Sequence, residues 1–356
     1  MLGLVTVLIQ WRAIVNSVGS RALPIELHRE EAEGGRTAVT CSESDVDGKA
    51  EASVAVETFR CFPGPSLRPF SDHQSSVLDY LDSRRKVHKD AIRFCQSILQ
   101  RKPIDWEPVL RHDLSRPIQN VDLVVTIGGD GTLLQASHFM DDSIPVLGVN
   151  SDPTQAKEVE DLNDAFDATR STGYLCAANV NNFEQMLDDI LEDRSVPSKL
   201  MRIAICVNSR LMPKYALNDI LVSHPCPAAV SRFSFRIKKD DQPCSPLVNC
   251  RSSGLRVSTA AGSTAAMLSA GGFRMPISSQ DLQYMVREPI SPGAASSLMH
   301  GVVKSDQVMD AAWFCKEGMI YIDGSHVRYS IEHGDNIVIS SKAPALRVYL
   351  SSHVLS

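Results

Sequence analysis

The feature that most constrains this chain is the run from Val121 to Ser137, VDLVVTIGGDGTLLQAS. Its first part, Val121 to Ile127, is apolar and rich in β-branched residues, as buried parallel strands are. Glycines interrupt the run at residues 128–132, and Leu133 to Met140 is predicted to be a helix. A strand that passes through glycines into a helix N-terminus can bind an anion, because the backbone can approach a phosphate and the helix end presents free N–H groups.

The acidic residue inside this loop is the most informative part of the motif. A carboxylate beside a phosphate site is unfavourable unless it has a role, such as accepting a hydroxyl proton or facing a metal ion. Asp130 is therefore the candidate catalytic residue, and the alternative is that it caps the helix. The residues predicted to shape the phosphate loop around it are Gly128, Gly129, Gly131 and Thr132.

Length and composition limit the class of protein. With 356 residues, 43% of them hydrophobic, the chain can form two domains. A net charge of −6 gives no support for nucleic-acid binding. No run of 18 apolar residues predicts a membrane span, so no membrane partner is expected.

Three further features favour a cytoplasmic location. The apolar stretch Met1 to Trp11 is short and is followed, not preceded, by Arg12, so a signal peptide is not expected. Val354-Leu355-Ser356 is not a peroxisomal address. The nine cysteines are scattered and include no C-x-x-C pair, which is typical of free thiols in a reducing compartment.

The order of predicted elements indicates an α/β fold: an N-terminal doubly wound parallel-sheet domain followed by a β-rich C-terminal domain. Residues 1–65 are expected to be a poorly ordered extension, because Arg29 to Asp47 is charged, Gly/Ser-rich and without periodicity. Order is expected to begin near Pro69. Residues 66–175 form the predicted α/β domain, with a helix over Ser75 to Lys102 and a second strand at residues 144–149. Residues 176–356 form the predicted β-rich, dinucleotide-binding domain, in which a helix near residues 183–191 precedes the strands. Its short strand-like runs lie at residues 201–207, 217–222, 229–237, 254–259, 319–322, 336–340 and 346–350.

Two more segments carry candidate binding residues. Residues 253–272, SGLRVSTAAGSTAAMLSAGG, combine a strand with a glycine- and hydroxyl-rich helix start near Ser263. An ordinary Ser/Thr cap is the alternative. Asn218 and Asp219 interrupt the apolar run 216–222, where an amide beside a carboxylate suits a vicinal diol or a base edge. A β-bulge or a strand-end cap is the alternative there.

Taken together and in this order, these segments resemble the NAD kinase family, most closely its plant NADH kinase branch. The Gly-Gly-Asp-Gly-Thr loop resembles the family's first motif, and Leu217-Asn218-Asp219 resembles its Asn-Glu motif with a shorter acid. Residues 254–272 resemble its long Gly/Ser/Thr motif. The pair Asp323-Gly324 and Glu332-His-Gly-Asp335 is similar to its C-terminal strands. The resemblance covers about residues 70–350, whereas the first motif alone also occurs in phosphofructokinases and lipid kinases.

The resemblance implies an ATP-dependent, Mg²⁺-requiring kinase that phosphorylates the adenosine 2′-hydroxyl of NADH, and alternatively NAD, to give NADPH or NADP. Asp130 would be the general base, and no residue is assigned as a metal ligand. A homodimer is also implied. The residues implied to contact the dinucleotide are Asn218, Asp219, Ser253, Thr264, Ala265 and Ser269. The alternatives are a non-catalytic NADH-binding sensor and a lipid kinase that shares the loop.

The chain departs from the family pattern at three places. Ser253 stands where the family usually has Asp, and Ala266 stands where an aromatic residue is usual. The Gly-x-Leu-Gly-Phe run expected after Asn150 is replaced by Ser151-Asp-Pro-Thr154. Loss of the aspartate removes a negative charge expected near the nicotinamide, so the sequence favours the reduced, uncharged ring.

Six other polar residues are considered as ligand contacts. His138, His224 and His300 are expected to be capped or solvated. Arg251 and Arg256 could reach phosphates, and the alternative is that they are solvated on an antiparallel sheet surface. Arg287, which precedes a Pro-rich loop, is kept as a candidate phosphate contact.

Overall fold

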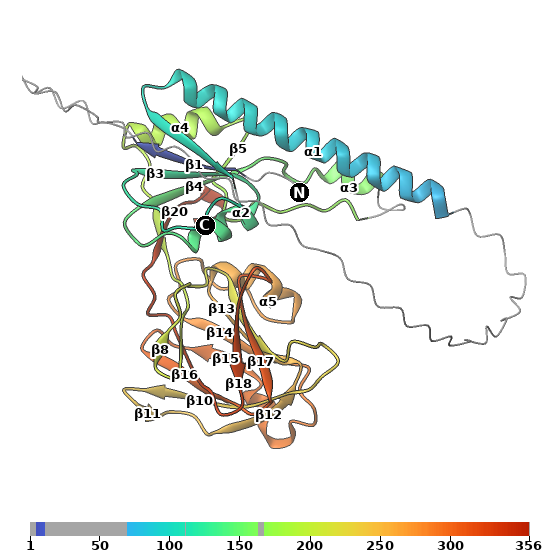
Figure 1. Cartoon of the computed structure of the whole chain (residues 1–356), viewed down its shortest axis with the longest axis vertical. Helices are drawn as coiled ribbons and strands as arrows, with labels where there is room; N and C mark the ends of the chain where they lie inside the picture. Colours follow the sequence, from blue (N-terminus) through green and yellow to red (C-terminus); the bar gives the residue numbers. More distant parts are fainter. Residues whose placement is uncertain (1–4, 11–69, 111, 163–166, 356) are drawn as a thin grey trace, which may run out of the picture. The chain divides into compact units, whose positions relative to one another are not determined.

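The computed structural model describes residues 5–10, 70–110, 112–162 and 167–355 (Figure 1). Val5 to Gln10 and the described residues from His73 onward belong to one unit. The predicted disordered stretch 29–47 lies outside the described residues. The proposed division at residues 65 and 175 remains a prediction.

The first sheet is mixed, with a parallel centre. Its strands run in the order β2-β1-β3-β4-β20-β6, and β5 also pairs with β4. At the centre, β4 is parallel to β3, to β20 and to β5. In contrast, β1 is antiparallel to β3, and β6 is antiparallel to β20. The bounds are β1 Val5–Gln10, β2 Asp105–Leu110, β3 Leu123–Gly128, β4 Pro145–Asn150, β5 Ala178–Asn179, β6 Ser198–Leu200 and β20 Leu346–Tyr349.

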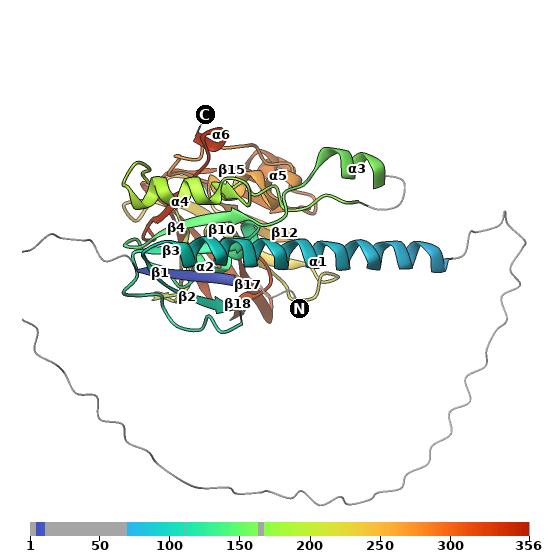
Figure 2. The same ribbon diagram turned by 90° about the horizontal axis from the view of Figure 1, so that it is seen from above.

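Helices cover both faces of this sheet. Alternate residues of β3 explain why: Val125 packs in a cluster with α1 and α4, whereas Val124 packs in a second cluster with α2. Every position of β3 and β4 is buried, as expected for parallel strands between two helical layers. Figures 1 and 2 show α1 and α4 over the same face. The bounds are α1 Phe70–Arg101, α2 Asp130–Ser137, α3 Ala156–Leu162 and α4 Phe183–Leu191. The predicted α/β class is confirmed.

Three local expectations differ from the structure. Ordered structure was expected to begin near Pro69, but Val5–Gln10 already forms a strand, β1, between β2 and β3. The helix after the glycine loop begins at Asp130 rather than at Leu133. β20, predicted with the β-rich half, joins the first sheet beside β4, because its apolar residues Leu346 and Val348 fill the cluster under α2.

The remaining strands form two antiparallel sheets that share one core. One has the order β11-β10-β16-β19-β7-β8 with β12 beside β10, and the other has the order β15-β14-β13-β9-β17-β18. Their inward-facing residues form a single apolar cluster, in which the Phe233 and Trp313 rings stack. This confirms the β-rich second half.

The bounds in these sheets are β7 Ala204–Val207, β8 Arg210–Leu211, β9 Asp219–Ser223, β10 Ser231–Lys239, β11 Gln242–Pro243, β12 Val248–Ser252, β13 Gly254–Ser258, β14 Leu282–Arg287, β15 His300–Val303, β16 Gln307–Trp313, β17 Glu317–Ile322, β18 Val327–Glu332 and β19 Asn336–Ser340. Short helices lie at η1 Ala261–Thr264, α5 Ala266–Ser269, η2 Gly293–Leu298 and α6 Ser352–Leu355. Among the described helices, none has the length and apolar character needed to cross a bilayer.

Candidate active site

The carboxylate of Asp130 lies at the N-terminus of α2, directly after β3. Gly129 is the N-cap residue, and no side chain caps this helix. Instead, the carboxylate of Asp130 accepts hydrogen bonds from the backbone N–H of Tyr174, at 3.0 Å, and of Leu175, at 2.8 Å. The helix-cap interpretation of Asp130 therefore does not describe its contacts. Two amide donors and the helix end hold this negative charge in one orientation.

The partner of Asp130 is a segment, Ser171 to Cys176, that sequence reasoning missed. The Ser171 hydroxyl accepts from the Asp130 N–H at 3.2 Å, and a Cβ on Gly129 would come within 2.7 Å of the Ser171 side chain. The Cys176 thiol lies 3.8 Å from the Asp130 carboxylate, and burial together with that carboxylate raises the thiol pKa. Glycine at position 129 thus permits close packing that any side chain would prevent.

This segment also revises one departure from the family pattern. After Asn150 the chain leaves the sheet through α3, and Thr172-Gly-Tyr-Leu175 then returns to the loop. The excursion is attached to α1 by two ion pairs of Arg84, with Asp152 at 3.3 Å and with Glu158 at 3.4 Å. A glycine- and leucine-containing run is therefore present beside Asp130, but it follows an additional excursion of the chain.

Residues from four separate segments surround one small pocket of about 180 Å³. Its lining includes four predicted site residues, and they come from the glycine loop, the 217–219 segment and η1: Asp130, Asn218, Thr264 and Ala265. This volume is smaller than the roughly 300–1,000 Å³ of drug-sized sites, so the pocket accommodates only part of a dinucleotide.

One buried oxygen atom of the pocket lining and one in the first turn of α2 have no hydrogen-bond partner within the described part of the chain. They are the Asn218 Oδ1 and the Thr132 Oγ1. Buried polar atoms are normally paired, so each is available to a ligand group. The backbone of η1 comes so close to Asn218 that a Cβ on Gly262 would lie 2.1 Å from the Asn218 carbonyl oxygen.

Asp219 is not part of this lining and pairs with an arginine. The Arg256 Nη1 lies 2.5 Å from the Asp219 Oδ2, and both side chains are largely buried. Burial raises the pKa of Asp219, and the Arg256 charge opposes that shift. Of the two alternatives for Arg256, solvation is wrong: Arg256 lies in β13, beside strand β9, which begins at Asp219. The structure leaves Arg251 exposed, in agreement with that alternative.

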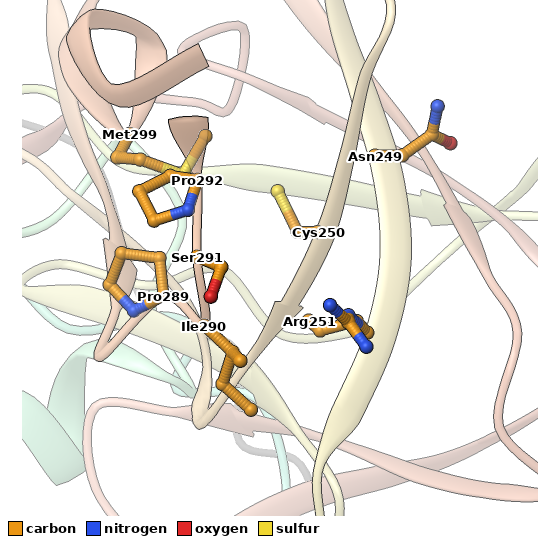
Figure 3. A pocket seen from close by; sticks show the side chains of 8 residues that line it. All are labelled: Asn249, Cys250, Arg251, Pro289, Ile290, Ser291, Pro292 and Met299. Atoms are coloured by element: carbon orange, nitrogen blue, oxygen red, sulfur yellow. The ribbon is translucent and has the colours of Figure 1, made fainter. Parts of the chain in front are cut away.

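Ser253 and Ser269 are not brought to this pocket. Ser269 is exposed at the end of α5. Ser253 lies at the opposite end of β13 from Ser258, and five residues of strand span about 16 Å. A second pocket of about 280 Å³ lies beside that end, between β12 and the Pro289–Pro292 turn (Figure 3).

An acidic residue lies next to Ser253 although the family aspartate is absent. The Ser253 hydroxyl hydrogen-bonds the carboxylate of Glu288, which together with the Arg287 charge lowers the pKa of Glu288. Arg287, a candidate phosphate contact, lies 3.4 Å from Glu288 and thus has an internal partner. His138, expected to be capped or solvated, instead contacts the Asp323 carboxylate at 3.0 Å.

The donor set bears on how a metal ion would bind. Across the described residues, no group of three or more His, Cys, Asp or Glu side chains could hold one. Mg²⁺ commonly binds through one or two carboxylates and the phosphates of its nucleotide. The residues present therefore fit an ion that arrives with ATP, and Asp130 is the carboxylate of the pocket lining that could face it.

The Arg256–Asp219 pair leads to a prediction about stability. Arg256→Met should lower the free energy of unfolding at neutral pH by about 3–5 kcal/mol, because it leaves a buried carboxylate unpaired. The folded pKa of Asp219 would rise further above the unfolded value of about 4. The loss of stability relative to the wild type should therefore be smallest below about pH 4 and grow as the pH rises toward the folded pKa of Asp219.

Urea unfolding across this pH range measures the effect. Arg251→Met, which removes an exposed arginine from the neighbouring segment, is the matched control and should change stability by less than about 0.5 kcal/mol. An Arg256→Met protein as stable as the control at neutral pH would refute the buried pair.

Comparison with known proteins shows similarity to NAD and NADH kinases. Residues 76–153 match the family described as the ATP-NAD kinase N-terminal domain. A probable NADH kinase from Oryza sativa subsp. japonica is 61% identical over 280 residues, which are 78% of this chain and 86% of that protein. An NADH kinase from Arabidopsis thaliana is 66% identical over 276 residues, 77% and 87% of the two chains.

Solved structures show the same fold at low sequence identity. An NAD kinase from Archaeoglobus fulgidus in complex with ATP superposes with a TM-score of 0.52 and 22% identity, covering 68% of this chain and 84% of that one. A yeast NADH kinase complexed with NADH superposes with a TM-score of 0.50 and 17% identity. The match covers 65% of this chain and 60% of that one. With two plant relatives above 60% identity over most of their length, the chain belongs to the NAD kinase family.

Proposed function

We propose that this protein is an ATP-dependent kinase that phosphorylates the adenosine 2′-hydroxyl of NADH, with NAD as an alternative substrate. The observation that carries the proposal is the oriented carboxylate of Asp130 in a pocket that it shares with Asn218 and Thr264. The names of the two plant relatives, NADH kinase and probable NADH kinase, support the same substrate. The structure of the Archaeoglobus fulgidus relative with ATP supports ATP as the donor.

The chemistry requires positioning more than covalent participation by the protein. The 2′-hydroxyl oxygen attacks the γ-phosphorus of ATP, a new P–O bond forms, and the bond to the β–γ bridging oxygen breaks to release ADP. Asp130 accepts the proton of the hydroxyl group. The positive end of the α2 dipole and the unpaired Thr132 hydroxyl in its first turn would favour the charged phosphate oxygens.

Mg²⁺ is proposed as the accompanying ion. When bound to the ATP phosphates, it would neutralise part of the charge that develops during transfer. The residues of this chain would then orient the two substrates, with Asp130 as the proton acceptor.

The two alternatives lack comparable support. A sensor that binds NADH without turnover has no use for a carboxylate in the phosphate loop. A lipid kinase would not need the Asn218 amide or the η1 segment, which line the same pocket as Asp130.

The direct test is product formation. Purified protein incubated with ATP, Mg²⁺ and NADH should form NADPH, and chelation of Mg²⁺ should abolish the reaction. Detectable NADH binding without NADPH would favour the sensor, and phosphorylation of a diacylglycerol instead of NADH would favour the lipid kinase.

A preference for NADH over NAD is also proposed. The oxidised nicotinamide carries a positive charge, so a free carboxylate nearby would favour NAD by about 1 kcal/mol or more. Ser253 supplies no charge. The acids that could replace the missing aspartate each have an arginine partner, Glu288 with Arg287 and Asp219 with Arg256.

The preference can be tested at the Ser253 end of β13. The wild type should show a higher kcat/KM for NADH than for NAD, and Ser253→Asp should shift the ratio toward NAD by up to about tenfold, which is 1.4 kcal/mol. Glu288→Gln, which removes the neighbouring charge, should shift it the opposite way. Unchanged ratios in both variants would remove the charge argument but leave the kinase assignment standing.

Two further properties are proposed from the family resemblance and the composition. The protein is a homodimer in solution, which light scattering would test: a monomeric mass at assay concentration would refute it. Its location is the cytoplasm, and a fluorescent fusion of the full chain found in another compartment would refute that.

A further inference from the structure

Asp323 occupies the turn between β17 and β18, and its carboxylate is enclosed by four donors. It accepts hydrogen bonds from the backbone N–H groups of Leu217, Asn218 and Asp219, at 2.8, 2.7 and 3.0 Å. The fourth donor is the His138 Nε2, at 3.0 Å. The Asp323 side chain is 0% exposed, so water does not compete for these bonds.

These contacts join the two segments that face each other across the pocket. Three consecutive N–H groups directed at one carboxylate define the backbone of residues 217–219 and hence the direction of the Asn218 side chain. His138 directly follows α2, whose first residue is Asp130. Eight residues of helix span about 12 Å, and a short helix transmits a displacement of one end to the other.

We propose that His138 and Asp323 are a pair of positioning residues that align the dinucleotide-binding segment 217–219 with Asp130. This inference rests on the proposed function. Neither side chain lines the Asp130 pocket. They act through the residues that do, by holding the helix that starts with the general base against the segment that carries Asn218.

The end of α2 has other attachments, which allow the pair to be tested without unfolding the helix. The fully buried Arg202 donates from Nη1 to the carbonyl oxygens of Ser137 and Met140, at 3.0 and 2.8 Å. The Lys214 Nζ donates to the His138 carbonyl oxygen at 2.7 Å. These bonds are made to the backbone, so they persist when only the His138 side chain is replaced.

The test compares three variants of the full chain. His138→Leu removes the donor to Asp323, and His138→Gln can restore it because its amide nitrogen can take the place of Nε2. Lys214→Met is the matched control: it removes a contact to the same helix end but does not touch Asp323. For each variant, kcat and KM are measured for NADH and ATP, together with the thermal midpoint.

We expect His138→Leu to lower kcat by about tenfold to a hundredfold, the usual effect of a misalignment near 1 Å, with the KM for ATP within about twofold of the wild type. His138→Gln should recover most of kcat, and Lys214→Met should leave it within about twofold. A purely structural role would instead give losses of kcat that follow the thermal midpoints of all three variants.

Each contrary result has a distinct meaning. Wild-type kcat in His138→Leu would overturn the positioning pair, and so would a kcat loss in Lys214→Met as large as in His138→Leu. No recovery in His138→Gln would overturn the role of the hydrogen bond. A wild-type protein that forms no NADPH would overturn the proposed function, and the pair with it.

Discussion

The site depends on how the chain holds one negative charge where phosphates are to bind. Asp130 lies at the N-terminus of α2, whose dipole favours negative charge, and its carboxylate accepts two backbone N–H bonds from Tyr174 and Leu175. Those donors come from a segment that packs against Gly129, where a side chain would not fit. The loop, the helix and the returning segment are therefore parts of one arrangement, and each is needed to orient the carboxylate.

Local sequence patterns predicted most of the elements but not their long-range partners. The 121–127 run, the glycine loop and the following helix were predictable because strand composition, glycine and helix periodicity are local properties. Two pairings were not predictable: β20 beside β4 in the first sheet, and β1 between β2 and β3. Pairing between distant strands leaves no local signal in the sequence. The Ser171–Cys176 segment was missed for the same reason: its contacts to Asp130 are made by backbone N–H groups, which every non-proline residue has.

The pairing of opposite charges could not be predicted from single segments of the sequence either. Asp219 was recognised as an acid within an apolar run, but its partner Arg256 lies on the neighbouring strand and was expected either to contact a phosphate or to be solvated. Likewise, the serine at position 253 suggested an absent charge, whereas Glu288 from the end of β14 stands beside it. In both places the electrostatic character of the site is set by pairs across a sheet, so the substitution of one residue does not by itself define the charge that a dinucleotide meets.

The central claim is that Asp130 accepts the proton of the 2′-hydroxyl group, and Asp130→Asn tests it most directly. The amide keeps one of the two backbone hydrogen bonds, so the fold should persist with a loss of about 1 kcal/mol. NADH binding, followed by its fluorescence, should be retained, while the rate of NADPH formation should fall by about 10²–10⁴-fold, the usual contribution of a positioned general base. An Asp130→Asn protein that binds NADH and turns over at nearly the wild-type rate would contradict the account.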